Sequence, residues 1–274
     1  MLGHPGWAVF VAAEYPPGKI TMAVLLVFFF AAVLWYIRRA RRDKDLYIRP
    51  IAGLAAINEA IGRATEMGRP ILYVPGIDDV DNIQTIASIS ILANVAKLAA
   101  SYDTRTIVPC RSPLVYPLAE ETVRNAFADA GRPDAFQRDD IRFLSDDQFA
   151  FTAGTAGIML RERPAANLYL GSFWAESLIL AETGFAAGAI QIAGTANVSQ
   201  LPFFVAACDY TLIGEELYAA SAYLSREPML LGSLKGSDLA KLVFGAIIVA
   251  GVVCANVPAW RDWFFELFRF AEGG

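Results

Sequence analysis

The hydrophobic positions of this chain form two patterns: long uncharged runs near its ends and short apolar runs between them. Residues 20–37 and 242–260 contain no charged residue. A helix as long as the first run spans about 27 Å, close to the roughly 30 Å hydrocarbon core of a bilayer. We therefore predict transmembrane helices at 20–37 and 239–258, preceded by an extracytoplasmic N-terminal segment at 1–19.

A basic cluster follows the first uncharged run. It consists of Arg38, Arg39, Arg41, Arg42 and Lys44. Because such clusters resist translocation, we expect this end of the helix to face the cytoplasm and both chain termini to lie outside. A cleaved signal peptide would carry its basic residues before a shorter apolar run. The expected location is the cell inner membrane, as a multi-pass protein with the lipid bilayer as one partner.

The second uncharged run and the tail both carry candidate contact faces. The small pairs Ala246/Ala250 and Gly251/Ala255 have the spacing that lets helices approach closely, although small residues are common in membrane helices. Residues 259–274 are predicted to form an amphipathic tail in the membrane interface, with a subunit contact as the alternative. Its apolar stripe consists of Trp260, Trp263, Phe264 and Leu267.

Residues 46–228 alternate short apolar runs with segments of helical periodicity. The runs predicted as strands are 71–74, 105–108, 141–144, 168–170, 190–193 and 210–213. Strands that are buried on both faces are almost wholly apolar, and their alternation with helices indicates parallel crossovers. The prediction is an α/β domain on the cytoplasmic side: a parallel sheet of about six strands with helices on both faces (Rossmann-like), flanked by two transmembrane helices. The sequence does not order the strands.

Such sheets bind ligands at the carboxyl ends of their strands. The candidate ligand-binding residues at this edge are Gly76, Asp78, Asp79, Arg111, Ser112, Gly171, Ser172, Glu176, Gly194, Thr195 and Asn197. Asp78 and Asp79 could bind a hard cation, but acidic residues also favour a helix start. Arg111 could hold a phosphate or carboxylate, or pair with an acidic loop. The glycines could expose amides to an anion, or serve plain turns.

The composition removes several kinds of chemistry. His4 is the single histidine, so the domain has no histidine-based triad, no histidine-ligated zinc and no histidine base. The sequence contains no nucleotide-binding or hydrolase motif of the common types. The net charge is −5, without a large basic patch for nucleic acid. Three scattered cysteines fit a reducing compartment, and Cys110 and Cys208 are expected to be buried and inert. No catalytic residue or metal site is predicted, and whether the protein uses a cofactor is unknown.

Two segments resemble a bacterial family of uncharacterised two-pass membrane proteins. They are the stretch from Arg49-Pro50 to Arg69-Pro70, which includes Gly62-Arg63-Ala64, and the segment Gly194-Thr195-Ala196. The similarity covers roughly residues 49–255. It implies the same two-anchor α/β layout and supplies no activity.

Two functional hypotheses remain at this point. In the first, the protein is an assembly or scaffold component whose domain docks to itself, as a homo-oligomer, or to a membrane protein complex. The missing catalytic motifs and the small-residue and aromatic faces favour it. In the second, a membrane-tethered sensor or enzyme binds a nucleotide or a small anionic ligand at the carboxyl edge. Whether the protein is an enzyme stays open.

Overall fold

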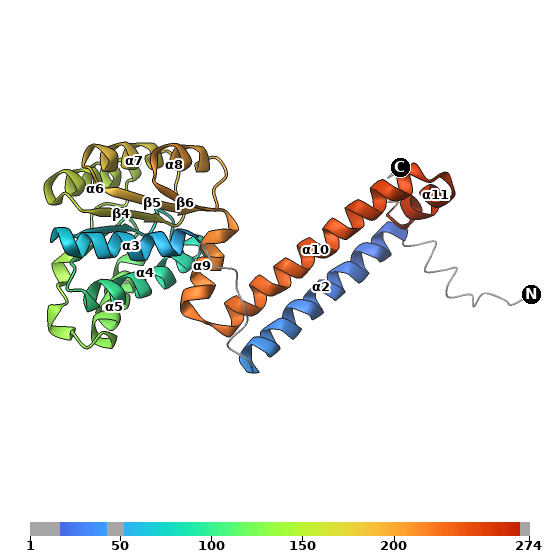
Figure 1. The fold of residues 1–274 in the computed structure, drawn as a ribbon, viewed down its shortest axis with the longest axis horizontal. Helices are drawn as coiled ribbons and strands as arrows, with labels where there is room; N and C mark the ends of the chain where they lie inside the picture. Colours follow the sequence, from blue (N-terminus) through green and yellow to red (C-terminus); the bar gives the residue numbers. More distant parts are fainter. Residues whose placement is uncertain (1–16, 43–51, 269–274) are drawn as a thin grey trace, which may run out of the picture. The chain divides into compact units, whose positions relative to one another are not determined.

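The computed structural model describes residues 17–42 and 52–268 (Figure 1). The chain divides into two compact units. One unit is formed by Met1–Leu46 together with Glu227–Gly274, and the other by Tyr47–Arg226. The predicted segment 1–16, the tail beyond residue 268, Lys44 and the motif residues 49–51 lie outside the described residues.

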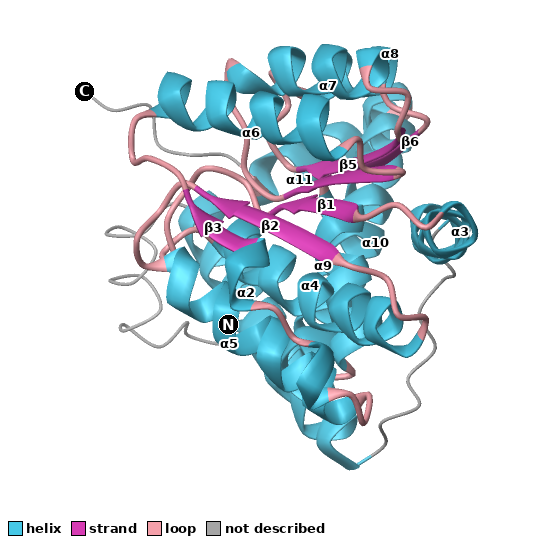
Figure 2. Ribbon diagram, turned by 90° about the vertical axis from the view of Figure 1, so that its left-hand side faces the viewer, coloured by secondary structure: helices cyan, strands magenta, loops and turns pink. Residues whose placement is uncertain are grey.

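The second unit is an α/β domain built on one six-stranded sheet (Figure 2). Its strands are β1 Ile71–Val74, β2 Thr106–Cys110, β3 Ile141–Phe143, β4 Ala166–Leu170, β5 Ile190–Thr195 and β6 Tyr210–Ile213. The order is β3-β2-β1-β4-β5-β6, and every neighbouring pair is parallel. The sequence therefore predicted the six strands and their parallel pairing correctly. The order reverses between β1 and β4, the position where doubly wound sheets bind ligands.

Helices cover both faces of the sheet (Figure 1). One face carries α3 Ala52–Met67, α4 Ile83–Ser101, α5 Val115–Asp129 and α9 Glu215–Ser225. The other carries α6 Gln148–Glu162, α7 Glu176–Ala186 and α8 Leu201–Ala207. Alternate strand residues point to opposite faces, so Ile71 and Tyr73 join the first core while Leu72 and Val74 join the second. All four are fully buried, which is why β1 is apolar throughout.

The helical unit contains α2 Pro17–Arg42, α10 Pro228–Asn256 and α11 Pro258–Leu267. A Cβ added to Gly232 would lie 2.5 Å from the Ile37 Cα, so the two helices approach backbone to backbone. Further along, the Phe29 and Phe244 rings lie 5.1 Å apart. As α2 runs back from residue 37 to residue 29, α10 runs forward, so α2 and α10 are an antiparallel pair.

Three of the described helices are long and apolar enough to cross a membrane. They are Lys19–Arg42, Ile83–Ser101 and Pro228–Asn256. The apolar window of the second is 61 % buried, and it covers the sheet as α4, whereas the windows of the other two are 0 % buried. Length and composition therefore indicate membrane association through α2 and α10.

Several element boundaries differ from the sequence prediction. Helix α10 begins at Pro228, eleven positions before the predicted 239, because Pro228 is well suited to the first helical position and no second proline follows before Pro258. The α2–α10 contact uses Gly232 and Gly236 of this added part, while Ala246 and Ala250 stay exposed. The Ala246/Ala250 pair therefore makes no close contact with α2, and contact with another subunit stays open for it.

Two strands continue through residues that were predicted to end them. Strand β5 includes Gly194, where a Cβ would lie 2.8 Å from Leu170 Cδ2, so glycine permits close packing inside the sheet. Strand β2 includes Pro109. It pairs with β1 only as far as Ile107 and then continues along β3, so the missing N–H of Pro109 does not interrupt the pairing with β1.

Candidate functional site: the carboxyl edge of the sheet

The loops after β1 and β4 meet at the point where the strand order reverses. Ile77 N donates to the Ser172 carbonyl at 2.9 Å and links the two loops directly. Gly76 and Gly171 have φ angles of +90° and +139°. A Cβ on Gly171 would lie 2.4 Å from the Pro75 carbonyl oxygen, and one on Gly76 would lie 2.6 Å from the Ser172 oxygen. The two backbones therefore fill the position where the crevice of a nucleotide-binding sheet lies.

The aspartates predicted at this edge hold the β1 loop in place. Asp78 accepts hydrogen bonds from Asn82 Nδ2 at 2.7 Å and from Trp174 Nε1 at 3.3 Å. Asp79 accepts from its neighbouring amide Val80 N at 2.7 Å and from Ser112 Oγ at 3.0 Å. These bonds connect the loop after β1 with those after β2 and β4. The carboxylates are thus used within the protein, but not at a helix start, because α4 is capped by Asn82 and has no acidic residue in its first turn.

Asn197, in the loop after β5, is the centre of a second set of bonds. Its Nδ2 donates to the Phe173 carbonyl at 2.6 Å and to Ser172 Oγ at 3.0 Å, and its Oδ1 accepts from Gln84 Nε2 at 2.9 Å. Gln84 Oε1 in turn accepts from Ala196 N at 2.7 Å. Gln84 was missed by sequence reasoning, and its position two residues after the cap residue Asn82 gave no signal for a long-range role.

Glu176, at the start of α7, is fully buried. Its Oε1 accepts from Trp174 N at 2.7 Å, and its Oε2 accepts from Gln148 Nε2 of α6. The cap of α6 is Asp147, whose side chain accepts from Ala150 N. Gln148, the first residue of α6, ties the loop after β3 to the loop after β4.

Arg111 occupies a different environment from the one expected. Its NH1 donates to the Ile77 carbonyl at 2.7 Å, while its Nε is buried without a partner. Within residues 17–42 and 52–268 it makes no ion pair, so the interpretation of Arg111 as the partner of an acidic loop was wrong. The structure thus brings the predicted residues of all four loops together, and it uses most of them to connect those loops.

Exposed apolar side chains surround this hydrogen-bonded edge. Each is half or more exposed, and each belongs to one of the connected loops or to the first turn after it: Ile83, Leu114, Phe149, Trp174 and Val198. We call these five residues the apolar rim. Leu114 follows Ser112 by two positions, Ile83 adjoins Asn82, and Val198 adjoins Asn197. A packed surface whose polar side chains, apart from the Nε of Arg111, bond mostly to one another, and which carries an apolar rim, resembles a protein contact surface more than a ligand pocket.

A family model described as "Domain of unknown function (DUF6754)" matches residues 12–265. The chain belongs to the DUF6754 family. A comparison with curated proteins and one with solved structures found no match. Membership confirms a family of unknown function and extends the resemblance on both sides of residues 49–255.

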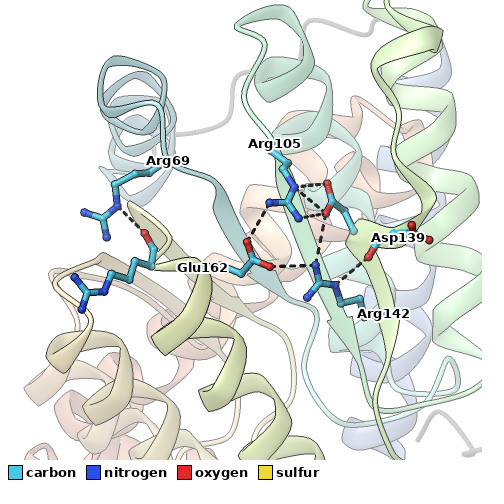
Figure 3. Close-up of polar contacts among 7 residues, drawn as sticks. Arg69, Arg105, Asp139, Arg142 and Glu162 are labelled. Atoms are coloured by element: carbon cyan, nitrogen blue, oxygen red, sulfur yellow. Dashed lines mark hydrogen bonds and ion pairs between the residues drawn. The ribbon is translucent and has the colours of Figure 1, made fainter.

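The opposite edge of the DUF6754 sheet, at the amino ends of the strands, contains a network of ion pairs (Figure 3). Arg105 pairs with the buried Asp140 at 2.6 Å and with Glu162 at 3.1 Å. Arg142 pairs with Glu162 at 3.3 Å. Burial disfavours the charged form of Glu162, but the bonds from Arg105 and Arg142 outweigh it and lower its pKa. This amino edge was not singled out from the sequence.

The DUF6754 domain offers little for redox or metal chemistry where it is described. Burial raises the pKa of the Cys110 thiol to about 12. Burial, followed by the charge of Asp209, does the same for Cys208. Both thiols are therefore protonated at neutral pH. In the part of the chain that the structure describes, no three histidine, cysteine, aspartate or glutamate side chains form a metal-binding group.

Proposed function

We propose that this protein is a membrane-anchored assembly protein of the inner membrane, and that its cytoplasmic α/β domain docks to another protein through the apolar rim. The observation that carries the proposal is the closed carboxyl edge, where polar side chains bond to one another while large apolar side chains remain in solvent.

The anchor is proposed to consist of α2 and α10. Leu26, Val27 and Phe30 are each about two thirds or more exposed, as expected of side chains that face lipid. Basic residues at 38, 39, 41 and 42 end α2, and Lys235 and Lys241 lie before the apolar part of α10. In an antiparallel pair both basic groups lie at the same end, which favours the cytoplasmic side for that end and for the domain between the helices.

The contact surface is proposed from the apolar rim. Large apolar groups that cluster on a surface, interspersed with satisfied polar groups, are typical of protein interfaces. Trp174 lies within the rim, and tryptophan is enriched among the residues that dominate interface energies. The edge is internally bonded, so docking would bury the rim without first breaking the loop structure.

The test is a photo-crosslinking experiment on the full chain in native membranes. A benzophenone amino acid replaces Val198 of the rim or, as the matched control, Val205 on the exposed face of α8. The proposal predicts a discrete protein adduct from position 198 and none from position 205. Equal labelling at the two positions, or adducts with lipid alone, would contradict it.

A second candidate function is the binding of a small anion, favoured by the buried and unpartnered Nε of Arg111. A guanidinium with unused donors at the carboxyl edge is suited to phosphate or carboxylate. Its test is a thermal-shift measurement with inorganic phosphate and ATP on the wild type and on Arg111→Gln. A stabilisation that Arg111→Gln abolishes supports this function, whereas the absence of any shift removes it.

A further inference from the structure

We propose that the partner docked on the carboxyl edge is the amino edge of a second copy of this chain. This inference rests on the proposed function and names the partner of the same surface. It is argued from the charge and the exposed apolar groups at the two opposite edges of one sheet.

The carboxyl edge is strongly acidic. Its acidic residues, from the loops after β1, β3, β4 and β6 and the helix starts that follow them, are Asp78, Asp79, Asp81, Asp146, Asp147, Glu176, Glu215 and Glu216. Arg111 is the one basic residue in those same loops and in the loop after β2. Asp81 and Asp146 are exposed and, among the described contacts, make no side-chain bond. A partner for this surface therefore needs cationic groups as well as apolar ones.

The amino edge supplies cationic groups that no acid in the described chain neutralises. Arg105 and Arg142 are occupied by Asp140 and Glu162, but Arg69, Arg161 and Arg163 make no ion pair within residues 17–42 and 52–268. Arg69 donates through Nε to the Arg163 carbonyl at 2.6 Å (Figure 3). This bond ties the end of α3 to the end of α6, which places the unneutralised arginines of both helices at one edge.

The same edge carries apolar groups that can complement the apolar rim. Met67, Leu160 and Phe185 are all more than half exposed and lie in the last turns of α3, α6 and α7. These helices all run antiparallel to the strands, so their ends lie at the amino edge. Both surfaces thus combine exposed apolar side chains with charge. At the ends of α3 and α6 the three unpaired arginines outnumber the exposed acid Glu66, so the charge of this part of the amino edge is opposite to that of the carboxyl edge.

Contact between opposite edges is head-to-tail, so each copy would keep one edge free for the next. Such heterologous contacts close into a ring or continue as a row. Two helices that anchor every copy in one bilayer confine the assembly to the membrane plane. The expected product is therefore a ring or a row, with a two-fold dimer as the alternative that the test must separate from it.

The test uses native mass measurement of the full chain in mild detergent with two charge-reversed variants. One variant, Asp81→Arg with Asp146→Arg, alters the carboxyl edge. The other, Arg161→Glu with Arg163→Glu, alters the amino edge. Each variant alone should be monomeric, because its two edges then carry charge of the same sign. An equal mixture should assemble again beyond a dimer, because the two intact edges are complementary and the two reversed edges are complementary as well.

Glu121→Arg reverses one exposed charge in the middle of α5, away from both edges, and it should keep the wild-type mass. Thermal unfolding checks that every variant folds. The inference would be overturned if the wild-type protein were monomeric in mild detergent, or if the amino-edge variant had the same assembled mass as the wild type. If position 198 then still crosslinks to a different protein, the proposed function stands without self-assembly; if it does not, both fail.

Discussion

The two edges of the sheet are built from similar loops but are held together by different interactions. At the carboxyl edge, hydrogen bonds connect the loops without a cationic partner: Asn197 is bonded to Phe173, Ser172 and Gln84, and the carboxylates of Asp78, Asp79 and Glu176 accept from neutral donors. At the amino edge, Arg105 and Arg142 are held by Asp140 and Glu162. The comparison shows that the edge where ligands usually bind is closed by short-range bonds and leaves apolar groups in solvent.

The largest expected effect comes from the loop contact at the carboxyl edge. Gly171→Ala would force a Cβ against the Pro75 oxygen at a φ of +139°, and we expect it to lower the free energy of unfolding by about 3 kcal/mol. The measurement is thermal unfolding followed by circular dichroism in detergent. Gly188→Ala, at a φ of +70° in open space, should cost only about 1 kcal/mol. Equal losses would mean that the two backbones are not in close contact.

The next effect concerns the amino edge. Arg105→Met leaves the buried Asp140 carboxylate without its main partner, and we expect a loss of about 2 kcal/mol in unfolding free energy. Arg105 is 39 % exposed, which keeps the loss below that of a fully buried pair. Arg63→Met removes the exposed pair with Glu59 and should cost less than about 0.5 kcal/mol. Similar losses in unfolding free energy for the two variants would show that the burial of Asp140 does not strengthen its pairing with Arg105.

Salt should separate the two edges. Asn197→Ala removes three neutral hydrogen bonds at the carboxyl edge and should cost about 1.5 kcal/mol. That loss should be the same at about 1 M NaCl, where screening acts within roughly 3 Å, whereas the Arg105→Met loss should shrink. Unfolding of both variants at low and high salt measures this difference. A salt-sensitive Asn197→Ala loss would contradict the assignment of neutral hydrogen bonds to Asn197.

The smallest effect is a pH dependence at the amino edge. The folded protein lowers the pKa of Glu162 below its usual 4.5, so its ionised form favours folding. Its contribution to the free energy of unfolding is complete above about pH 4.5 and is lost as the pH falls through the lowered folded-state pKa. The stability difference between the wild type and Glu162→Gln should therefore be constant near neutral pH and shrink in acid. A difference that grows in acid would reverse the sign of the shift.

The fold was more predictable than the edges. Strands such as β1 are buried on both faces and can therefore be recognised in the sequence as continuous apolar runs. Gly194 and Pro109 were predicted to end their strands. Whether a strand can include them depends on neighbours such as Leu170 and on where β1 stops pairing with β2. Both features depend on tertiary contacts, which the local sequence pattern does not reveal.

The sequence predicted which residues lie at the carboxyl edge, but it did not predict their contacts. Parallel topology alone brings Asp79, Ser112 and Asn197 to the same edge. Whether Arg111 meets an acid or a carbonyl depends on side-chain geometry, and the apolar rim emerges only when the exposure of Ile83 and Val198 is known. Single apolar residues at helix starts are common in sequences. They indicate a contact surface only when the structure shows that several of them are exposed at the same edge.

Protection of the apolar rim in the membrane tests the account most directly. Val198→Cys and Val205→Cys, each in a chain with Cys208 and Cys254 replaced by alanine, are labelled with a maleimide in opened membranes and again after dissociation in detergent. We expect Val198→Cys to react several-fold more slowly than Val205→Cys in membranes and to lose this protection in detergent. Equal reaction rates at the two positions in membranes would contradict docking through the carboxyl edge.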